Sequence, residues 1–285
     1  MATKVNIIKN MALMTAIALC MLAFASCKDK NPPNITMTVP PTNKVIFYMA
    51  GSGKITINWG DGTIKTKRLR AYKYSYNFFR YRHRFIHSYS NSSAHTIKIS
   101  GSNITHLATS SFTEDGLMTN NLTSLDVSGA TALTVLMCYD SQLTELDLRN
   151  NTALRYLNCS NNQLTELDLN ANAALIDLSC SNNQLTKLDL SANIALTELH
   201  CPHNQIMELD LSANTALRYL NCDSNNLSTE ALNALFKTLY NNPKHNWIVI
   251  ANNPGTDNCD IRIAEEKGWT VFTSGEGMFV IMYEE

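Results

Sequence analysis

The chain has 285 residues and is nearly neutral, with 23 lysines and arginines against 24 aspartates and glutamates. This balance excludes a protein whose whole surface is attracted to nucleic acid, and we expect no nucleic-acid partner. The length allows two or three compact units.

Residues 1–27 have the pattern of an export signal. Lys4 and Lys9 precede an apolar run at residues 11–24, which is too short to span a bilayer. Small residues then lead to Cys27. This ending resembles the lipobox of bacterial lipoproteins, in which the peptide is cut before the cysteine and the cysteine is acylated. An ordinary secretory signal with an incidental cysteine is the alternative.

The resemblance makes Cys27 the expected lipidation site and residues 28–33 a charged linker. Charges directly after the cysteine are similar to the surface-export signal of Bacteroides-type lipoproteins. We therefore expect a protein attached to the outer membrane by its lipid and exposed at the cell surface. An orientation toward the periplasm stays open.

Residues 34–106 have the pattern of a small all-β domain. Strands are expected at residues 44–48, 54–58 and 95–99, and residues 59–63 (WGDGT) predict a tight turn. His87 and Tyr89 follow in an H-x-Y motif. Together these motifs resemble the PKD-type immunoglobulin-like module, although here the tryptophan directly precedes the glycine and serines replace a later glycine. The resemblance implies a β-sandwich that acts as a spacer or an adhesion module.

Residues 65–84 within this domain contain eight lysines and arginines, six tyrosines and phenylalanines, and no acidic residue. Their alternation predicts a hairpin around Asn77. Aromatic rings that stack on sugars and guanidinium groups that bind acidic groups would make this hairpin a glycan-binding site. The candidate residues are Arg70, Tyr72, Tyr74, Arg80, Tyr81 and Arg82. The alternative is an edge hairpin whose aromatic side chains pack inward while its basic ones keep it soluble.

Residues 107–227 are dominated by one 21-residue phrase, written five times between Leu122 and Leu227. Each copy holds two legs in which leucine alternates with polar residues, as in a half-buried strand. The phrase resembles the leucine-rich repeat, L-x-x-L-x-L-x-x-N/C-x-L. We expect an internalin-like solenoid of stacked coils, with parallel strands on both broad faces because about five residues between the legs leave no room for a helix.

Two asparagine columns and one cysteine column are expected inside the coils. The asparagines are Asn162, Asn183, Asn204 and Asn225 in one column and Asn151, Asn172, Asn193 and Asn214 in the other. Buried amides require hydrogen bonds, which backbone groups of the neighbouring coil can supply. The cysteines are Cys138, Cys159, Cys180, Cys201 and Cys222, which we interpret as buried free thiols, with a disulfide framework as the alternative.

The repeats are acidic, with 14 acidic and four basic residues between positions 107 and 227. Much of this charge lies in one column, formed by Asp126, Asp147, Asp168, Asp189 and Asp210. A calcium ion between neighbouring carboxylates is the sharper hypothesis, and a screened, exposed row is the simpler one. His200 and His203 have metal-ligand spacing, but Cys201 between them faces inward, so no metal site and no cofactor are predicted.

The outward positions of the first leg vary from coil to coil. Partners of solenoids bind to such an extended face, where tyrosines offer large contact area at low entropic cost. The candidate ligand-binding residues are Tyr139, Tyr156, Asn158, His200, Tyr219 and Asn221. The alternative is that these positions vary because nothing touches them.

Residues 228–285 predict an α/β cap on the last coil. Ser228 precedes a helical pattern of leucines, residues 247–250 form a buried-type strand, and a short helix at residues 261–267 precedes strands at 269–273 and 278–283. The expected fold is thus mostly β, a leucine-rich-repeat solenoid between a PKD-like sandwich and this cap.

No nucleophile elbow, phosphate loop or zinc-protease motif occurs, and the seven histidines are scattered. We therefore expect a monomeric, non-catalytic surface protein that binds a protein partner through the repeats. Binding of a glycan through the basic-aromatic hairpin is the second hypothesis, and a structural spacer is the third.

Overall fold

The computed structural model describes residues 33–70, 83–113, 116–118, 120–241 and 246–274. The described residues from Asn34 onward belong to one compact unit. Cys27, with the rest of the predicted export signal, lies outside the described residues, as do Tyr72, Tyr74, Arg80, Tyr81 and Arg82. Among the described helices, none has the length and hydropathy needed to cross a membrane.

Seven strands form the N-terminal region, and they belong to two different sheets. They are β1 (Ile35–Val39), β2 (Lys44–Gly51), β3 (Gly53–Asn58), β4 (Ile64–Leu69), β5 (His83–Ser88), β6 (His95–Gly101) and β7 (Ile104–Ala108). One sheet has the order β10-β1-β6-β3-β4, and β5, β2 and β7 form the end of the other. The predicted strands at residues 44–48, 54–58 and 95–99 are thus present as parts of β2, β3 and β6.

The W-GDG and H-x-Y motifs meet in the core between these sheets. Gly60 and Gly62 both have positive φ, 86° and 90°, in the predicted turn between β3 and β4. The ring of Trp59 stacks on His87 with centroids 4.7 Å apart, and the Tyr89 hydroxyl donates to the Trp59 carbonyl at 2.9 Å. His87 Nε2 lies 2.7 Å from Asp61 Oδ2. This hydrogen bond lowers the pKa of Asp61 to about 2. The two motifs therefore fasten the β3–β4 turn to the end of β5.

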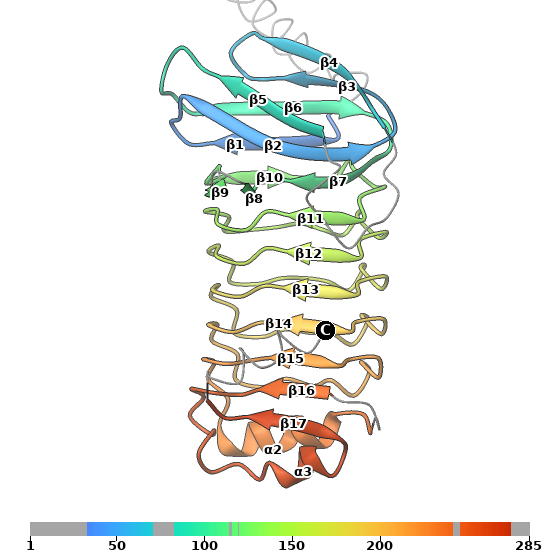
Figure 1. Cartoon of the computed structure of the whole chain (residues 1–285), viewed down its shortest axis with the longest axis vertical. Helices are drawn as coiled ribbons and strands as arrows, with labels where there is room; N and C mark the ends of the chain where they lie inside the picture. The colour runs from blue at the N-terminus through green and yellow to red at the C-terminus, as the bar shows by residue number, and fades with distance from the viewer. Residues whose placement is uncertain (1–32, 71–82, 114–115, 119, 242–245, 275–285) are drawn as a thin grey trace, which may run out of the picture. The chain divides into compact units, whose positions relative to one another are not determined.

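The repeats stack through one short strand per coil. The strands are β11 (Val135–Met137), β12 (Tyr156–Asn158), β13 (Asp177–Ser179), β14 (Glu198–His200) and β15 (Tyr219–Asn221). Each pairs with the next in parallel, so that Leu157 lies opposite Leu178 and Leu178 opposite Leu199. These leucines are at most 2% exposed and form one continuous core. Figure 1 shows the strands as the rungs of a ladder.

After β10, the second leg of each coil is no strand, so the prediction of strands on both broad faces is wrong for these coils. Residues 145–148 carry no strand, and no backbone hydrogen bond joins them to the next coil. A turn follows these residues directly, because Asp147 Oδ1 accepts from the Arg149 N–H at 3.0 Å and the backbone N–H of Asn151 donates to the Leu148 carbonyl. Only β10 (Ser124–Asp126), at the N-terminal end, is a strand, and it pairs with β1.

The two asparagine columns hold the coils together at their two edges, as predicted. Asn183 donates to the carbonyls of Cys159 and Cys180, both at 3.1 Å, and accepts from the Leu164 N–H at 3.0 Å. In the other column, Asn193 donates to the carbonyls of Leu169 and Asn172, but its Oδ1 atom has no partner. In the first coil, the hydroxyl of Ser141 takes the place of the amide and accepts from the Leu122 N–H at 3.2 Å.

The repeat sheet continues into one of the two N-terminal sheets. Strand β7 pairs in parallel with β11, which places His106 beside Val135, and it pairs with β2 on its other side. The small hairpin β8 (Ser111–Thr113) and β9 (Gly116–Met118) follows β7. The ten-stranded sheet therefore runs from β5 through every coil to the C-terminal strands.

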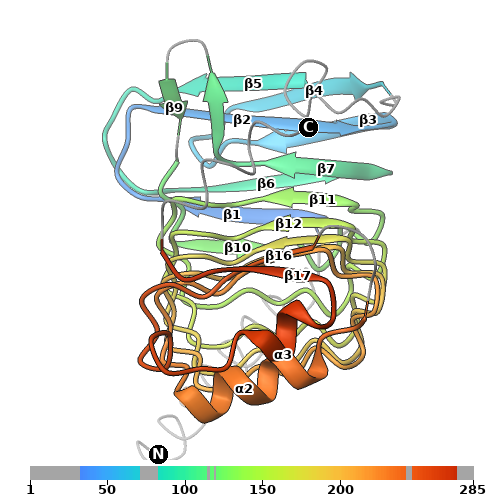
Figure 2. The same ribbon diagram turned by 60° about the horizontal axis from the view of Figure 1, so that its bottom comes forward.

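The C-terminal region adds two further coils to the same sheet. Strand β16 (Asn246–Val249) pairs with β15, and β17 (Trp269–Phe272) pairs with β16. Helix α2 (Thr229–Thr238) begins at Ser228, whose side chain accepts from the Ala231 N–H. Helix α3 (Arg262–Glu265) follows β16. In Figure 2, α2 lies across the coil from β16, where the earlier coils have their second leg. The strand expected at residues 278–283 lies outside the described residues.

Candidate functional site

The outward side chains of the parallel strands form two rows, which we call the strand face. The register places the first residues of the strands side by side and does the same for the third residues. The first row is Val135, Tyr156, Asp177, Glu198, Tyr219 and Trp247, and the second is Met137, Asn158, Ser179, His200, Asn221 and Val249. Because the strand backbones bond to each other, these side chains are not needed to hold the coils together.

Four side chains at the middle of the strand face lie close to one another. Asp177 is opposite Glu198, and Glu198 is opposite Tyr219. The His200 and Tyr219 rings have centroids 4.6 Å apart, and His200 Nε2 lies 3.9 Å from Glu198 Oε2. Burial, with the adjacent charge of Glu198, raises the pKa of Asp177 to about 6, whereas the nearby His200 lowers the pKa of Glu198. The middle of the face is thus acidic and is bordered by tyrosines.

The prediction of exposed ligand-binding side chains is wrong for Tyr139 and Asn221. Tyr139 is 7% exposed, and its carbonyl accepts from the hydroxyl of Ser110 in the segment after β7. Asn221 is 1% exposed because β16 continues the sheet beside it, and its Oδ1 accepts from the Asp223 N–H at 3.0 Å. Both residues lie at ends of the repeat array, where the neighbouring segment differs from a repeat.

The other candidates on the strand face keep accessible surface. Tyr156, Asn158, His200 and Tyr219 are all half-buried. The Oδ1 atom of Asn158, however, accepts from the Ser160 N–H at 3.1 Å, so this side chain shapes its own turn. Tyr156, His200 and Tyr219 are therefore the predicted residues that the structure brings together as a surface.

Trp247 belongs to this surface and was not among the residues predicted from sequence. It is half-buried and lies directly beside Tyr219 in the register of β15 and β16. The signal that could have identified it is Asn253, which stands 28 residues after Asn225 and repeats its bonds, donating to the Cys222 carbonyl and accepting from the Leu227 N–H. A coil lengthened by helix α2 hides this repeat from a search at 21 residues.

The opposite side of the coils, which we call the second-leg face, carries the aspartate column. Each of these carboxylates accepts a hydrogen bond from the backbone N–H two residues later. Asp168, for example, accepts from the Asn170 N–H, and Asp189 accepts from the Ser191 N–H. Such bonds fix the turn that follows. An open groove of about 970 Å³ runs along this face, lined by the carboxylates and by leucines such as Leu146 and Leu167. The main structural role of these aspartates is therefore to fix the backbone turn that follows each of them.

No group of three or more metal-ligating side chains is positioned to hold an ion among the described residues. His200 and His203 diverge, since His200 lies on the strand face while His203 is exposed at the following turn with a φ of 55°. That turn has the same left-handed backbone in every coil, at Asp140, Asn161, Asn182, His203, Ser224 and Asn252. This column was not predicted from the sequence, and asparagine adopts its left-handed conformation with little strain.

The five column cysteines are buried free thiols, as predicted from their inward register. Each is at most 1% exposed. Burial raises the pKa of the Cys159 and Cys201 thiols to about 12. These thiols are protonated at neutral pH and fill the core as small apolar groups.

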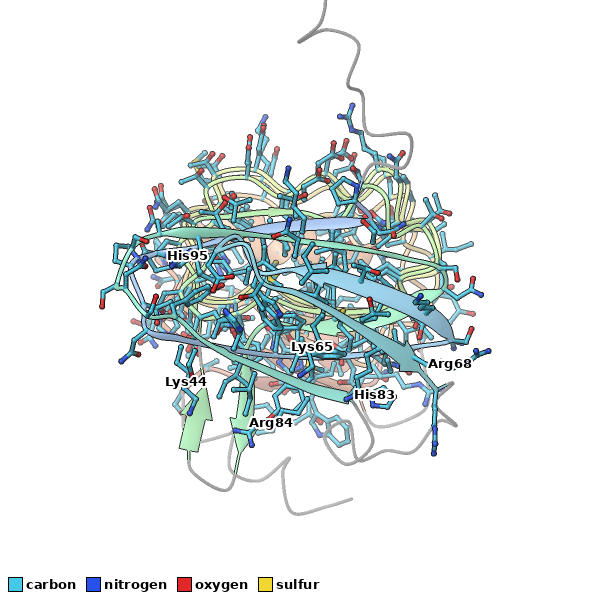
Figure 3. All side chains as sticks on the ribbon, turned by 90° about the horizontal axis from the view of Figure 1, so that it is seen from above. Lys44, Lys65, Arg68, His83, Arg84 and His95 are labelled. Atoms are coloured by element: carbon cyan, nitrogen blue, oxygen red, sulfur yellow. The ribbon has the colours of Figure 1, made fainter. Side chains whose placement is uncertain are left out.

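Basic side chains gather at the other end of the molecule, on β4 and β5. Figure 3 looks onto this end and shows Lys65, Arg68, His83 and Arg84. Strand β4 pairs with β3 and β5 pairs with β2, so these two strands belong to different sheets. The hairpin predicted around Asn77 lies outside the described residues. Of the six candidate residues there, only Arg70 is described, and its side chain is exposed.

Comparison with known proteins supports the repeat reading. Residues 153–173 match the family model described as Leucine Rich Repeat. No curated protein matches the chain. Together with the uniform register of the five coils, the family match identifies the middle of the chain as a leucine-rich-repeat solenoid.

Several solved structures are similar to parts of the chain. One is the functional domain of InlJ from Listeria monocytogenes, described as including a cysteine ladder, with 33% identity over 59% of this chain and 39% of that one and a TM-score of 0.42. Another is the internalin InlF from the same species, with 27% identity over 53% and 45% of the two chains and a TM-score of 0.43. A third is its internalin C2, with 20% identity over 60% and 81% and a TM-score of 0.40. The chain thus spans less than half of the first two structures.

Proposed function

We propose that this leucine-rich-repeat protein is a non-catalytic binding protein of the cell surface that holds a protein partner on its strand face. The observation that carries the proposal is the first outward row, which contains three aromatic residues. Its order is Tyr156, two acidic residues, Tyr219 and then Trp247. Tyrosine and tryptophan are enriched among the few residues that supply most of the binding energy at protein interfaces. The stacked coils make this row long and rigid, which lowers the entropic cost of binding.

Attachment to the outer membrane through a lipid on Cys27 is part of the proposal. It is supported by the apolar run and the small residues before this cysteine. The linker at residues 28–33 would then separate the lipid from the first strand, β1. Mass spectrometry of the mature chain tests this point. We expect acylated Cys27 at the N-terminus, and an unmodified mature chain would contradict the anchor.

Photocrosslinking tests the proposed interface. A photoreactive phenylalanine analogue is placed at Tyr156 or Tyr219 in the full chain, and matched controls carry it at Thr165 or Thr186, which are exposed on the second-leg face. The expected result is one crosslinked protein shared by both strand-face positions and absent from both controls. Equal crosslinking from the two faces, or none from either, would contradict binding on the strand face.

Glycan binding at the N-terminal end is the second candidate function. The observation in its favour is the exposed basic edge strand β4, with Lys65 and Arg68, followed by Arg70. Replacing Arg68 and Arg70 by glutamine keeps the strand while it removes two charges. If this function holds, the variant loses binding on a glycan array and keeps the photocrosslinks from Tyr156 and Tyr219.

A further inference from the structure

The centre of the strand face has an order of side chains that favours one kind of partner group. Along the first row, Tyr156, Asp177, Glu198 and Tyr219 are consecutive, one from each of β12 to β15. Neighbouring strands lie about 4.8 Å apart, so the two tyrosines are separated by roughly 14 Å, with both carboxylates between them. Two acidic groups are therefore enclosed on both sides by aromatic rings.

Asp177 has no partner of its own within the described part of the chain. Its carboxylate makes no hydrogen bond or ion pair there, in contrast to the carboxylates of Asp168 and Asp189, which accept from backbone N–H groups. It is half-buried and lies directly beside Glu198, whose ion pair with His200 is long at 3.9 Å. A partly buried carboxylate next to a like charge costs free energy, and a cation bound between the two removes this cost.

We infer that the protein partner places an arginine side chain over Asp177 and Glu198, between the rings of Tyr156 and Tyr219. This inference rests on the proposed function and deepens it. A guanidinium group matches the arrangement because its planar fork can bond two carboxylate oxygens while its face stacks on a tyrosine. Cation–π contact adds to the attraction, and the excess of acidic residues in the repeats speeds the approach of a basic segment.

The same reasoning disfavours the second-leg face as the site for this group. Its aspartates already hold backbone N–H groups, and Asp147 also binds Arg149 through an ion pair of 2.8 Å. The residues that line its groove include the basic side chains of Arg149 and Lys187 but no aromatic side chain. An arginine there would find charge without a ring to stack on.

Binding of short peptides to the full chain tests the inference. The probe is the peptide acetyl-Gly-Arg-Gly-Arg-Gly-amide, and its matched controls carry citrulline or lysine in place of arginine. Surface plasmon resonance on the immobilised, detergent-solubilised chain measures the affinity. We expect the arginine peptide to bind at least tenfold more tightly than the citrulline peptide and several-fold more tightly than the lysine peptide.

A pair of double variants locates the site. Asp177→Asn with Glu198→Gln is expected to lower the affinity for the arginine peptide at least tenfold. Asp168→Asn with Glu166→Gln also removes two negative charges, but from the second-leg face, and is expected to change the affinity less than twofold. Circular dichroism confirms that both variants fold. If Asp177→Asn with Glu198→Gln does not fold, Asp177→Asn alone replaces it, with the same expectation of weaker binding. Equal losses in both variants, equal affinity for citrulline or lysine, or no binding to the wild-type chain would each overturn the inference.

The photocrosslinking experiment separates this inference from the proposed function. If the Asp177→Asn, Glu198→Gln variant still crosslinks its protein from Tyr156 and Tyr219 with undiminished yield, the strand face binds a partner but not through an arginine. If the wild-type chain yields no specific crosslink at either position, the proposed function itself fails.

Discussion

Each coil of this solenoid has two extended legs with the same alternation of leucine and polar residues, yet the two legs are held in different ways. The strand leg bonds backbone to backbone with its neighbours, so that Tyr156, Asp177 and Glu198 can differ freely at equivalent positions. The second leg lacks such bonds, and its turn depends on the side chain of an aspartate such as Asp168. Outward residues are therefore uniform in the second leg, where side chains shape the backbone. They vary in the strand leg, where the outward side chains have no such structural role.

The largest effect is expected when the two asparagine columns at the edges of these legs are broken in turn. Asn183→Ala removes the bonds to Cys159 and Cys180 and leaves the buried Leu164 N–H without an acceptor. We expect a loss of about 3 kcal/mol in the free energy of unfolding. Urea unfolding of the full chain, followed by circular dichroism, measures it.

Asn193→Ala is the matched variant in the other column. Asn193 is buried even more fully than Asn183 but uses only its two donor bonds, and its Oδ1 atom is buried without a partner. Truncation removes this uncompensated acceptor as well as the bonds, so we expect a smaller loss of roughly 1–2 kcal/mol. Equal losses for the two variants would show that bonding by Oδ1 does not distinguish the columns.

A second test compares one aspartate from each face. Burial and Glu198 raise the pKa of Asp177 to about 6 from an ordinary value of 3.8. A raised pKa means that the folded state favours the protonated acid, so the ionised form costs stability above pH 6, and this cost disappears as the pH falls through 6 toward 4. The groups facing Asp177 are Tyr156 on β12 and Glu198 and His200 on β14. Asp177→Asn should therefore stabilise the chain by roughly 1–2 kcal/mol at pH 7.5.

The control for this test is Asp168→Asn on the second-leg face. Asparagine keeps the Oδ1 acceptor for the Asn170 N–H, so we expect little change at either pH. Thermal unfolding at pH 7.5 and at pH 4.5 measures both variants. An Asp177→Asn variant that gains as much at pH 4.5 as at pH 7.5 would mean that its stabilisation does not come from removing a charge.

The core of the repeats could be predicted from sequence because inward positions admit few residue types. The leucine, asparagine and cysteine columns stand at one spacing, and the structure buries all of them. The state of the second leg could not be predicted in this way. A period of two shows which side chains face inward. It does not show whether neighbouring backbones come close enough to form hydrogen bonds, because this depends on the spacing between coils. The alternation of residues from Glu145 to Leu148 does not specify that spacing.

The candidate site could be predicted only in its middle. Tyr156 and His200 have repeats on both sides, so an outward register position is also an accessible one. Tyr219 keeps accessible surface beside Trp247 of β16. Tyr139 and Asn221 have the same register but lie beside the segment after β7 and the lengthened last coil, which cover them. Trp247 lies beyond a coil whose length differs from 21 residues, so a fixed period does not reach it.

The smallest expected effect concerns a backbone position between the two faces. His203 has a φ of 55°, at a turn where Asn161 and Asn182 occupy the same conformation in the preceding coils. Because asparagine tolerates this left-handed region better than histidine, His203→Asn should stabilise the chain by roughly 0.5 kcal/mol. Thermal unfolding measures the gain.

His200→Asn is the matched change on the strand face. It removes the ring that packs on Tyr219 at 4.6 Å and relieves no backbone strain, so it should give no gain in stability and should weaken the arginine peptide. His203→Asn should leave peptide binding unchanged, because that side chain lies on the turn and not on the strand face. If His203→Asn weakened the peptide as much as His200→Asn, the binding surface would extend around the edge of the coil, and the division between a backbone-shaping turn and a free strand face would not hold there.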